Sequence, residues 1–178
     1  MVYERWMQTR RLRAEWSFVL PAYDEYMHYA VDSIAIPHLW ITGLVLEQDE
    51  SIPEALWSLC ALVKQCAVVV RLANDLASYR REEQEGVVNA VAVIREELRE
   101  RDKADENECT ARALTVVGER LTQSRADLRE MARQIRTRTR IEHRYVRAAE
   151  LSADLYAAGD VRDWRTGAGV ALEAAPGV

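Results

Sequence analysis

The pattern of apolar and polar positions predicts an all-α fold. Alternating runs of Val, Thr and Tyr, which would indicate strands, are nearly absent, and Gly and Pro interrupt the chain only sparsely. We therefore expect a helical bundle. The expected helices cover residues 3–18, 22–46 with an internal break, 53–85, 88–101, 110–136 and 141–158.

Local signals mark several of the helix ends. Pro37 lacks an amide donor and clashes with the preceding turn, so the second helix should kink or split between Ser33 and Pro37. Pro53 suits the first turn of the long helix, with Ser51 as its cap, and Gly86 suits its end. The first two thirds of this helix are apolar on nearly every face, which is typical of a helix buried in the middle of a bundle.

Length and composition favour one domain, residues 1–166, with a disordered tail at 167–178. The most apolar stretch, 59–72, contains Lys64, Gln65 and Arg71, so we expect no membrane span. Residues 1–13 carry four arginines and no apolar core, which does not resemble a secretory signal, and we expect a cytoplasmic protein. Three cysteines at these spacings favour neither disulfides nor a zinc site.

Charge argues against nucleic acid as a partner. The net charge is −5 and the pI is about 5.4, so bulk electrostatic binding to nucleic acid or anionic membrane is disfavoured. One basic stripe does follow the helical period, and we interpret it as a solvated face that the acidic residues at 96–108 balance. Its members are Arg125, Arg129, Arg133, Arg136, Arg140, Arg144 and Arg147.

One row of oxygen-bearing side chains carries candidate chemistry. Asn74, Ser78 and Glu82 are spaced four residues apart near the end of the long helix, so all three project from one stripe of its surface. An amide carbonyl, a hydroxyl and a carboxylate are hard donors, and three of them leave an octahedral ion open for phosphate oxygens and water. The row therefore predicts Mg²⁺, or Mn²⁺ in its place.

The surroundings of the row suit an anionic ligand. Arg71, Arg80 and Arg81 stand within a turn of it, and guanidinium groups beside a metal favour a ligand with several negative charges. The alternative is an ordinary amphipathic helix end, in which Asn74 and Asp75 are solvated and Glu82 pairs with Arg80 or Arg81. The spacing alone leaves these two interpretations equally open.

The stretch 74–82 reads N-D-L-x-S-x-x-x-E and resembles the second metal-binding motif of class I terpene synthases. Gly86, Asn89 and Val91 are similar to the turn that follows the motif in that family, and 15–33 is similar to its segment before a broken helix. The resemblance covers about Trp6 to Trp164 and implies the C-terminal half of the class I terpenoid synthase α-fold.

The resemblance implies a role for individual residues. Asn74, Ser78 and Glu82 would bind one Mg²⁺, and Arg81 would contact the diphosphate of a C10–C20 prenyl diphosphate substrate. The break at 33–37 would place Ser33 and Ile34 against the prenyl chain. Tyr29, Trp40 and Trp57 are candidates for the cavity wall, with ordinary core packing as the alternative for all three.

One departure from the family pattern limits the expected activity. The chain contains no Asp-Asp pair, whereas the family carries an aspartate-rich first motif that holds further metal ions. We expect weak or no activity alone, as a fragment, a truncated reading frame or one member of a split pair. A second copy or an N-terminal partner chain would be its partner. The alternative function is a non-catalytic helical interaction protein that retains a relic metal motif.

Overall fold

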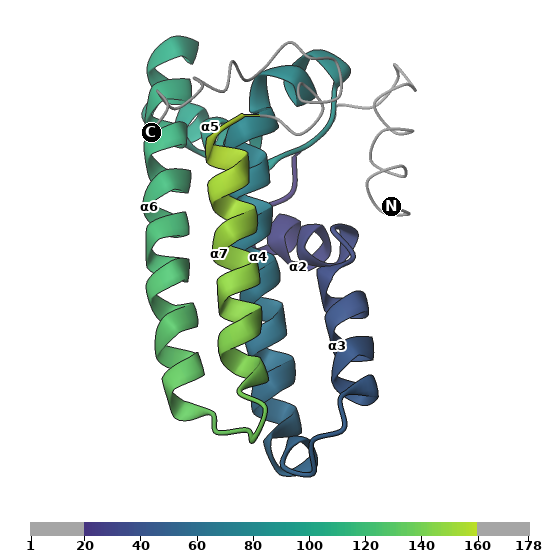
Figure 1. The fold of residues 1–178 in the computed structure, drawn as a ribbon. Coiled ribbons are helices and arrows are strands. Elements are labelled where there is room, and N and C mark those ends of the chain that lie inside the picture. Colours follow the sequence, from purple (N-terminus) through teal and green to yellow (C-terminus); the bar gives the residue numbers. More distant parts are fainter. Residues whose placement is uncertain (1–19, 160–178) are drawn as a thin grey trace, which may run out of the picture.

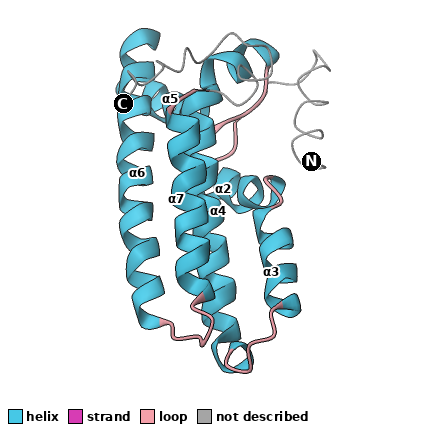
Figure 2. Ribbon diagram, viewed as in Figure 1, coloured by secondary structure: helices cyan, strands magenta, loops and turns pink. Residues whose placement is uncertain are grey.

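The computed structural model describes residues 20–159, and all the regular secondary structure in this range is helical (Figure 2). The all-α prediction is therefore confirmed. The expected helix at 3–18 and the expected tail at 167–178 lie outside the described residues. The described helices are α2 (Tyr23–Ser33), α3 (Ile36–Leu46), α4 (Ile52–Glu85), α5 (Ala90–Asp102), α6 (Glu106–Gln134) and α7 (Ile141–Ala157).

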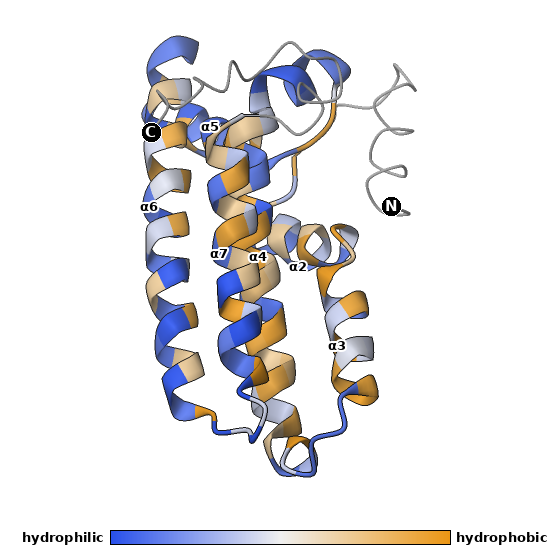
Figure 3. Cartoon of the chain, viewed as in Figure 1, coloured by the Kyte–Doolittle hydropathy of each residue, from blue (hydrophilic) through white to orange (hydrophobic). Residues whose placement is uncertain are grey.

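Helix α4 is the centre of the bundle. It contacts α2, α3, α5, α6 and α7, and its most extensive contacts are with α7 and α6, which run alongside it (Figure 1). Orange segments are frequent along the middle and lower part of α4, whereas blue and white segments dominate α6 (Figure 3). The predicted burial of the first two thirds of this helix is confirmed for its middle, where Leu59, Leu62 and Val63 are fully buried.

Two apolar clusters meet along α4. The first joins α4 to α7 and the C-terminal half of α6 through residues such as Leu62, Leu128 and Ala149. The second joins α2, α5 and the N-terminal half of α6 around Leu72 of α4 and Val93 of α5. Burial of these side chains contributes roughly 25 cal/mol for each Å² removed from water, so the hydrophobic effect holds the buried faces of α4 against its neighbours.

The predicted break between α2 and α3 is present. The two helices meet at an angle of 50°, and Ala35 between them has a left-handed backbone with φ of 62°. Pro37 then occupies the first turn of α3, where its missing amide proton costs nothing. The break turns α3 down along the first half of α4.

Capping residues set two helix starts. Asn89 accepts hydrogen bonds from the backbone amides of Val91 and Ala92 at the start of α5. Asp105 accepts one from Asn107, and α6 therefore begins at Glu106 rather than at the expected Thr110. The Asp105 carboxylate beside the positive end of the helix dipole stabilises the first turn of α6, although the segment is highly charged.

Ser51 does not act as the expected cap of α4. It stands before the helix, but its hydroxyl donates to Asp49 and accepts from the backbone amide of Arg138 at 2.9 Å. Asp49 also accepts from the amide and hydroxyl of Thr139, each at 2.8 Å. The Ser51 hydroxyl therefore takes part in hydrogen bonds that join the α3–α4 loop to the α6–α7 loop.

By length and composition, α4 could cross a membrane, and the bent pair α2–α3 passes the same test as one unit. Half of the most apolar window of α4 is buried inside the bundle, and the central helix of a bundle has the same composition. This composition is therefore weak evidence for a membrane span. The expectation that the chain has no membrane span stays a prediction.

Candidate metal centre

The row of oxygen donors lies on the C-terminal part of α4, before the turn that leads into α5. Ser78 and Glu82 are buried, with 1% and 8% of their surfaces exposed, and Asn74 is half-buried. The hydroxyl of Ser78 donates to the carbonyl oxygen of Asn74 at 2.7 Å. Because the Ser78 proton points to the helix backbone, the oxygen lone pairs are left for a cation.

The carboxylate of Glu82 is held on one side. Its Oε2 accepts a hydrogen bond from Nδ2 of Asn89 at 3.1 Å, and its Oε1 lies 3.7 Å from Nη2 of Arg81. Burial raises the pKa of Glu82, and the negative charge of Asp75 raises it further, while Arg71, Asn89 and Ser78 lower it. A cation at this carboxylate would therefore stabilise a charge that the buried setting disfavours.

The side-chain amide of Asn74 makes no hydrogen bond within the described part of the chain, so its oxygen is free to bind a ligand. The three donors are hard oxygens on one helix stripe, and their chemistry fits a divalent cation such as Mg²⁺. Clusters of three or more His, Cys, Asp or Glu suited to a metal are absent from residues 20–159. This leaves the mixed amide, hydroxyl and carboxylate row as the candidate.

Asp75, beside the row, is fully buried, so the alternative in which it is solvated is wrong. Its Oδ2 accepts from the Tyr26 hydroxyl at 2.8 Å and from the backbone amide of Ala90 at 2.9 Å. Its Oδ1 lies 2.9 Å from Nε of Arg71. Successive helix positions are rotated by about 100°, so Asp75 lies on the same buried side of α4 as Glu82, about 20° from it, and away from the half-buried Asn74.

Arg71 extends this buried network to the helix break. Its Nη2 donates to the Tyr26 hydroxyl at 2.5 Å and its Nη1 donates to Ser33 Oγ at 3.2 Å. The pKa of Tyr26 is raised well above its usual range, first by burial and then by the charge of Asp75. The network fixes α2 and the α2–α3 break against the part of α4 that carries the row.

Arg81 lies beside Glu82 and pairs more closely with Glu85, whose Oε2 is 3.0 Å from its Nη1. Part of the ordinary helix-end interpretation therefore applies, since Glu82 does have an arginine nearby. Arg80 differs, because it donates to the hydroxyl of its neighbour Tyr79 at 2.9 Å. Contact between Arg81 and a diphosphate stays a prediction.

The structure separates the residues expected to line a cavity. Ser33 joins the network under the row, and Ile34 packs at the edge of the first apolar cluster. Trp40 stacks on Tyr145 of α7 with ring centres 4.7 Å apart, and the Tyr145 hydroxyl donates to the Trp40 carbonyl at 2.8 Å. This arrangement agrees with the core-packing alternative for Trp40.

The other two aromatic candidates lie at the surface of the described structure. Tyr29 is 41% exposed, with its ring against the edge of His28. Trp57 is 86% exposed and stands seventeen residues before Asn74 on the same helix, about 25 Å away at 1.5 Å per residue. The structure therefore does not bring Trp57 together with the row.

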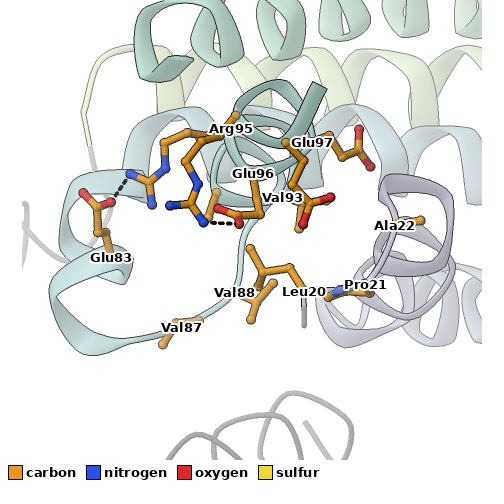
Figure 4. A pocket seen from close by; sticks show the side chains of 13 residues that line it. Leu20, Pro21, Ala22, Glu83, Val87, Val88, Val93, Arg95, Glu96 and Glu97 are labelled. Atoms are coloured by element: carbon orange, nitrogen blue, oxygen red, sulfur yellow. Dashed lines mark hydrogen bonds and ion pairs between the residues drawn. The ribbon is translucent and has the colours of Figure 1, made fainter. Parts of the chain in front are cut away.

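A cavity of about 500 Å³ lies beside the α4–α5 turn (Figure 4). It is bordered by Leu20 and the following residues, by Val87 and Val88, and by charged side chains of α5. Glu83 and Arg95 form an ion pair at its edge. None of the three row residues lines it. The expected apolar cavity beneath the row stays a prediction.

The basic stripe is balanced by acidic residues other than those expected. Arg125 pairs with Asp154, Arg129 with Glu150, and Arg144 with Glu47, rather than with residues 96–108. The stripe is also divided by the turn at 135–140 between α6 and α7. Arg129 and Arg144 have exposed side chains, as a solvated face requires, whereas Arg125 is 23% exposed and its Nε is buried. Asp154 and Glu150 belong to α7, which packs against α6, and Glu47 follows the last residue of α3.

Two site features were not assigned a role in the sequence analysis. The buried Arg71–Asp75–Tyr26 network has one local signal, an arginine four residues before an aspartate inside an apolar helix. The contact between Asn89 and Glu82 has no local signal beyond the turn residues around Gly86. Both depend on how α2 and α5 pack on α4.

Comparison with known proteins supports one family. The model of terpene synthase family 2, C-terminal metal binding, matches residues 3–123, which is more than half of the chain. The match includes α2, the break, the row and the turn that carries Asn89. No curated protein and no solved structure matches the chain significantly. The chain belongs to terpene synthase family 2 and is a terpene synthase-like protein of a family described as metal binding.

Proposed function

We propose that this protein binds Mg²⁺ and the diphosphate of a C10–C20 prenyl diphosphate, and takes part in its ionisation and cyclisation. The observation that carries the proposal is the row itself. Asn74, Ser78 and Glu82 present three hard oxygens from one stripe, and the Glu82 carboxylate is held by Asn89 at 3.1 Å. The family, described as metal binding, supports the same assignment.

The chemical step needs little proton transfer from the protein. The bond between the prenyl carbon and the diphosphate oxygen breaks, the electron pair leaves with the diphosphate, and an allylic cation remains. Bound Mg²⁺ would neutralise the charge that builds up on the departing group. Arg81 would donate hydrogen bonds to the same oxygens. The diphosphate itself would accept the proton that ends the cyclisation.

The distribution of apolar and polar side chains along α4 supports this proposal. The row lies at the polar end of a helix whose middle is fully buried among apolar side chains. Ser33 and Ile34 at the α2–α3 break lie near the same end, because Arg71 joins Ser33 to the network beneath the row. An apolar cavity wall beside this polar end would suit a substrate with an apolar chain and an anionic head, and it would exclude water from the cation.

Binding of inorganic pyrophosphate tests the proposal. Isothermal titration calorimetry should detect pyrophosphate binding that requires Mg²⁺ or Mn²⁺, and Asn74→Ala combined with Glu82→Ala should abolish it. The matched control is Glu83→Ala with Gln84→Ala, which removes the same kinds of groups from exposed positions of the same helix end. Equal affinity in the row variant and the control would refute the metal site.

A second candidate function is a non-catalytic interaction protein that pairs with a second copy or with an N-terminal partner chain. One observation favours it. Leu39, Val45 and Leu46 of α3 and Trp57 of α4 are 67%, 78%, 76% and 86% exposed, and the ribbon of α3 carries several orange segments in Figure 3. Exposed large apolar side chains, when they form a contiguous patch, are typical of protein-binding surfaces.

Sedimentation analysis separates the two candidates. If the apolar group mediates pairing, Leu46→Glu with Trp57→Glu should dissociate the complex without affecting pyrophosphate binding. A monomer with metal-dependent pyrophosphate binding would favour the enzyme component. A stable complex without such binding would favour the interaction protein. A cytoplasmic location remains part of the proposal for either candidate.

A further inference from the structure

Asn89 connects three parts of the molecule through one side chain. It is 1% exposed, and its Oδ1 accepts from the amides of Val91 at 2.9 Å and Ala92 at 3.1 Å. Its Nδ2 donates to Glu82 Oε2 at 3.1 Å and to the Asp75 carbonyl oxygen at 3.2 Å. The amide has two donors and two acceptor lone pairs, and all four are used.

The turn after α4 brings Asn89 back over the helix that precedes it. Gly86 ends α4 in the left-handed conformation, with φ of 71°. The amide of Val87 donates to the Glu82 carbonyl at 2.7 Å, and that of Gly86 donates to the Glu83 carbonyl at 3.2 Å. This tight C-terminal turn reverses the chain within three residues, so that Asn89 lies beside the turn of α4 that contains Glu82.

Helix capping accounts for only half of these contacts. A cap needs one acceptor oxygen, and Asp105 starts α6 with a single bond to Asn107 at 2.8 Å. The NH₂ group of Asn89 adds nothing to the cap and is directed instead at Glu82 and at a carbonyl of α4. A serine or an aspartate would cap α5 comparably well, but neither carries this donor.

The contact fixes one oxygen of the carboxylate and leaves the other available. Oε2 of Glu82 is held by Asn89, whereas Oε1 faces Arg81 at 3.7 Å, beyond ordinary hydrogen-bonding distance. A buried carboxylate held by one oxygen keeps a single orientation before any ion arrives, so less ordering is needed on binding.

We infer that Asn89 is a positioning residue that orients the Glu82 carboxylate for a divalent cation. The inference rests on the proposed function, because it assigns Glu82 as the ligand. It adds a role for the residue that caps α5, which would act on the ion only through Glu82. It also makes the α4–α5 turn part of the metal centre, since Asn89 is placed by Gly86.

The test compares Mn²⁺ binding with folding stability in the same variants. Asn89→Ser keeps a capping oxygen for α5 and loses the amide donor, so its melting temperature should stay close to that of the unsubstituted protein. Its Kd for Mn²⁺ with inorganic pyrophosphate, followed by electron paramagnetic resonance, should rise about 10–100-fold, the usual effect of losing a partner of a ligand.

Asp105→Ala is the matched control, because it removes a helix cap in the same bundle without contacting the row. Its melting temperature should fall while its Kd for Mn²⁺ stays unchanged. Where Asn89→Ser does not fold, Asn89→Gly replaces it, because glycine is also tolerated at caps and lacks the donor.

The outcomes separate this inference from the proposed function. If Glu82→Ala loses Mn²⁺ and the Asn89 variant binds it as tightly as the unsubstituted protein, positioning by Asn89 is overturned and the metal site stands. If Glu82→Ala itself binds Mn²⁺ unchanged, the proposed function is overturned, and the inference with it. Weakened binding in Asn89→Ser at an unchanged melting temperature supports both.

Discussion

Arg71 and Asp75 form an ion pair inside the bundle, with Nε of Arg71 2.9 Å from Oδ1 of Asp75 and side chains 5% and 0% exposed. The two residues are one turn apart on α4, directly beneath the row of oxygen donors. Other hydrogen bonds of the two side chains reach Tyr26 and Ser33 of α2 and the first amide of α5. A pair buried this deeply is stabilised only while every partner is in place.

Asp75→Asn should strongly destabilise the fold, because it leaves the Arg71 charge buried without its counter-ion. Loss of one partner from a buried pair typically costs about 3–5 kcal/mol. Urea unfolding followed by circular dichroism measures the change. The control is Asp154→Asn, which removes the partner of Arg125 in a more exposed pair and should cost less than about 1 kcal/mol. Similar losses in the two variants would contradict a buried network.

Asp49→Asn should reduce stability at neutral pH and much less in acid. The pKa of Asp49 is held well below its usual range, chiefly by the hydrogen bond from the Ser51 hydroxyl and also by the amide of Thr139. Because the pKa is lower in the folded state, the carboxylate stabilises the fold above its unfolded-state pKa and loses that effect as the pH falls.

Unfolding of the two proteins at pH 7 and at stepwise lower pH checks this expectation. The difference in stability should shrink as the pH drops below about 4, where the unfolded carboxyl group becomes protonated. A difference that is constant with pH would mean that the link between the α3–α4 and α6–α7 loops does not depend on the charge of Asp49.

Trp40→Ala and Trp57→Ala should differ in stability, although both are tryptophan deletions. Trp40 stacks on Tyr145 between α3 and α7, so its loss should cost roughly 2 kcal/mol, less than the ~3–5 kcal/mol of a fully buried tryptophan. Trp57 is 86% exposed, and its loss should change stability by less than about 0.5 kcal/mol. Thermal unfolding of both variants at low protein concentration provides the comparison.

The opposite ranking would place Trp57, rather than Trp40, in a packed interior. A strong concentration dependence of the Trp57→Ala result alone would instead point to burial of this side chain between two chains, as the second candidate function requires.

Gly86→Ala and Gly118→Ala should have opposite effects. Gly86 has φ of 71°, where a Cβ atom costs about 1–2 kcal/mol, so the substitution should destabilise the fold. Gly118 lies within α6, and a Cβ there would meet nothing within 4 Å, so alanine should stabilise by roughly 0.5–1 kcal/mol. Chemical denaturation of both variants measures this.

The Mn²⁺ affinity of the same two variants adds a second measurement. Gly86→Ala should also weaken Mn²⁺ binding, because the turn carries Asn89 to Glu82, whereas Gly118→Ala should leave it unchanged. Destabilisation by Gly86→Ala without any change in Mn²⁺ affinity would show that the turn is structural only.

Local signals were sufficient for the helices and for the row. Pro37 forces the break between α2 and α3, and Gly86 ends α4, because each restricts the backbone whatever surrounds it. The spacing of Asn74, Ser78 and Glu82 places them on one stripe through helix geometry alone. The start of α6 was missed by four residues, because the Asp105 cap lies inside a charged run that favours a loop.

Partners distant in the sequence could not be predicted in this way. Asp75 was weighed as solvated beside Asn74, yet it is enclosed by Tyr26, forty-nine residues earlier, and by Ala90, fifteen residues later. Trp40 and Trp57 are the same residue type, and both lie in apolar stretches of helix. They differ because Tyr145 of α7 packs on Trp40, which only the folded structure shows. Asp154 and Glu150, which pair with Arg125 and Arg129 of the basic stripe, also come from another helix, α7.

The amino-acid sequence by itself determined which residues form helices, where the chain breaks between α2 and α3, where α4 ends, and which three oxygens share a stripe, because these properties depend on backbone torsions and a fixed helical period. Only the tertiary structure decided which polar groups are buried and which groups they bond to. The burial of Asp75 and the hydrogen bond from Asn89 to Glu82 arise where α2 and α5 pack against α4. Burial and long-range hydrogen bonds depend on surfaces brought together by hydrophobic packing, which no local pattern specifies.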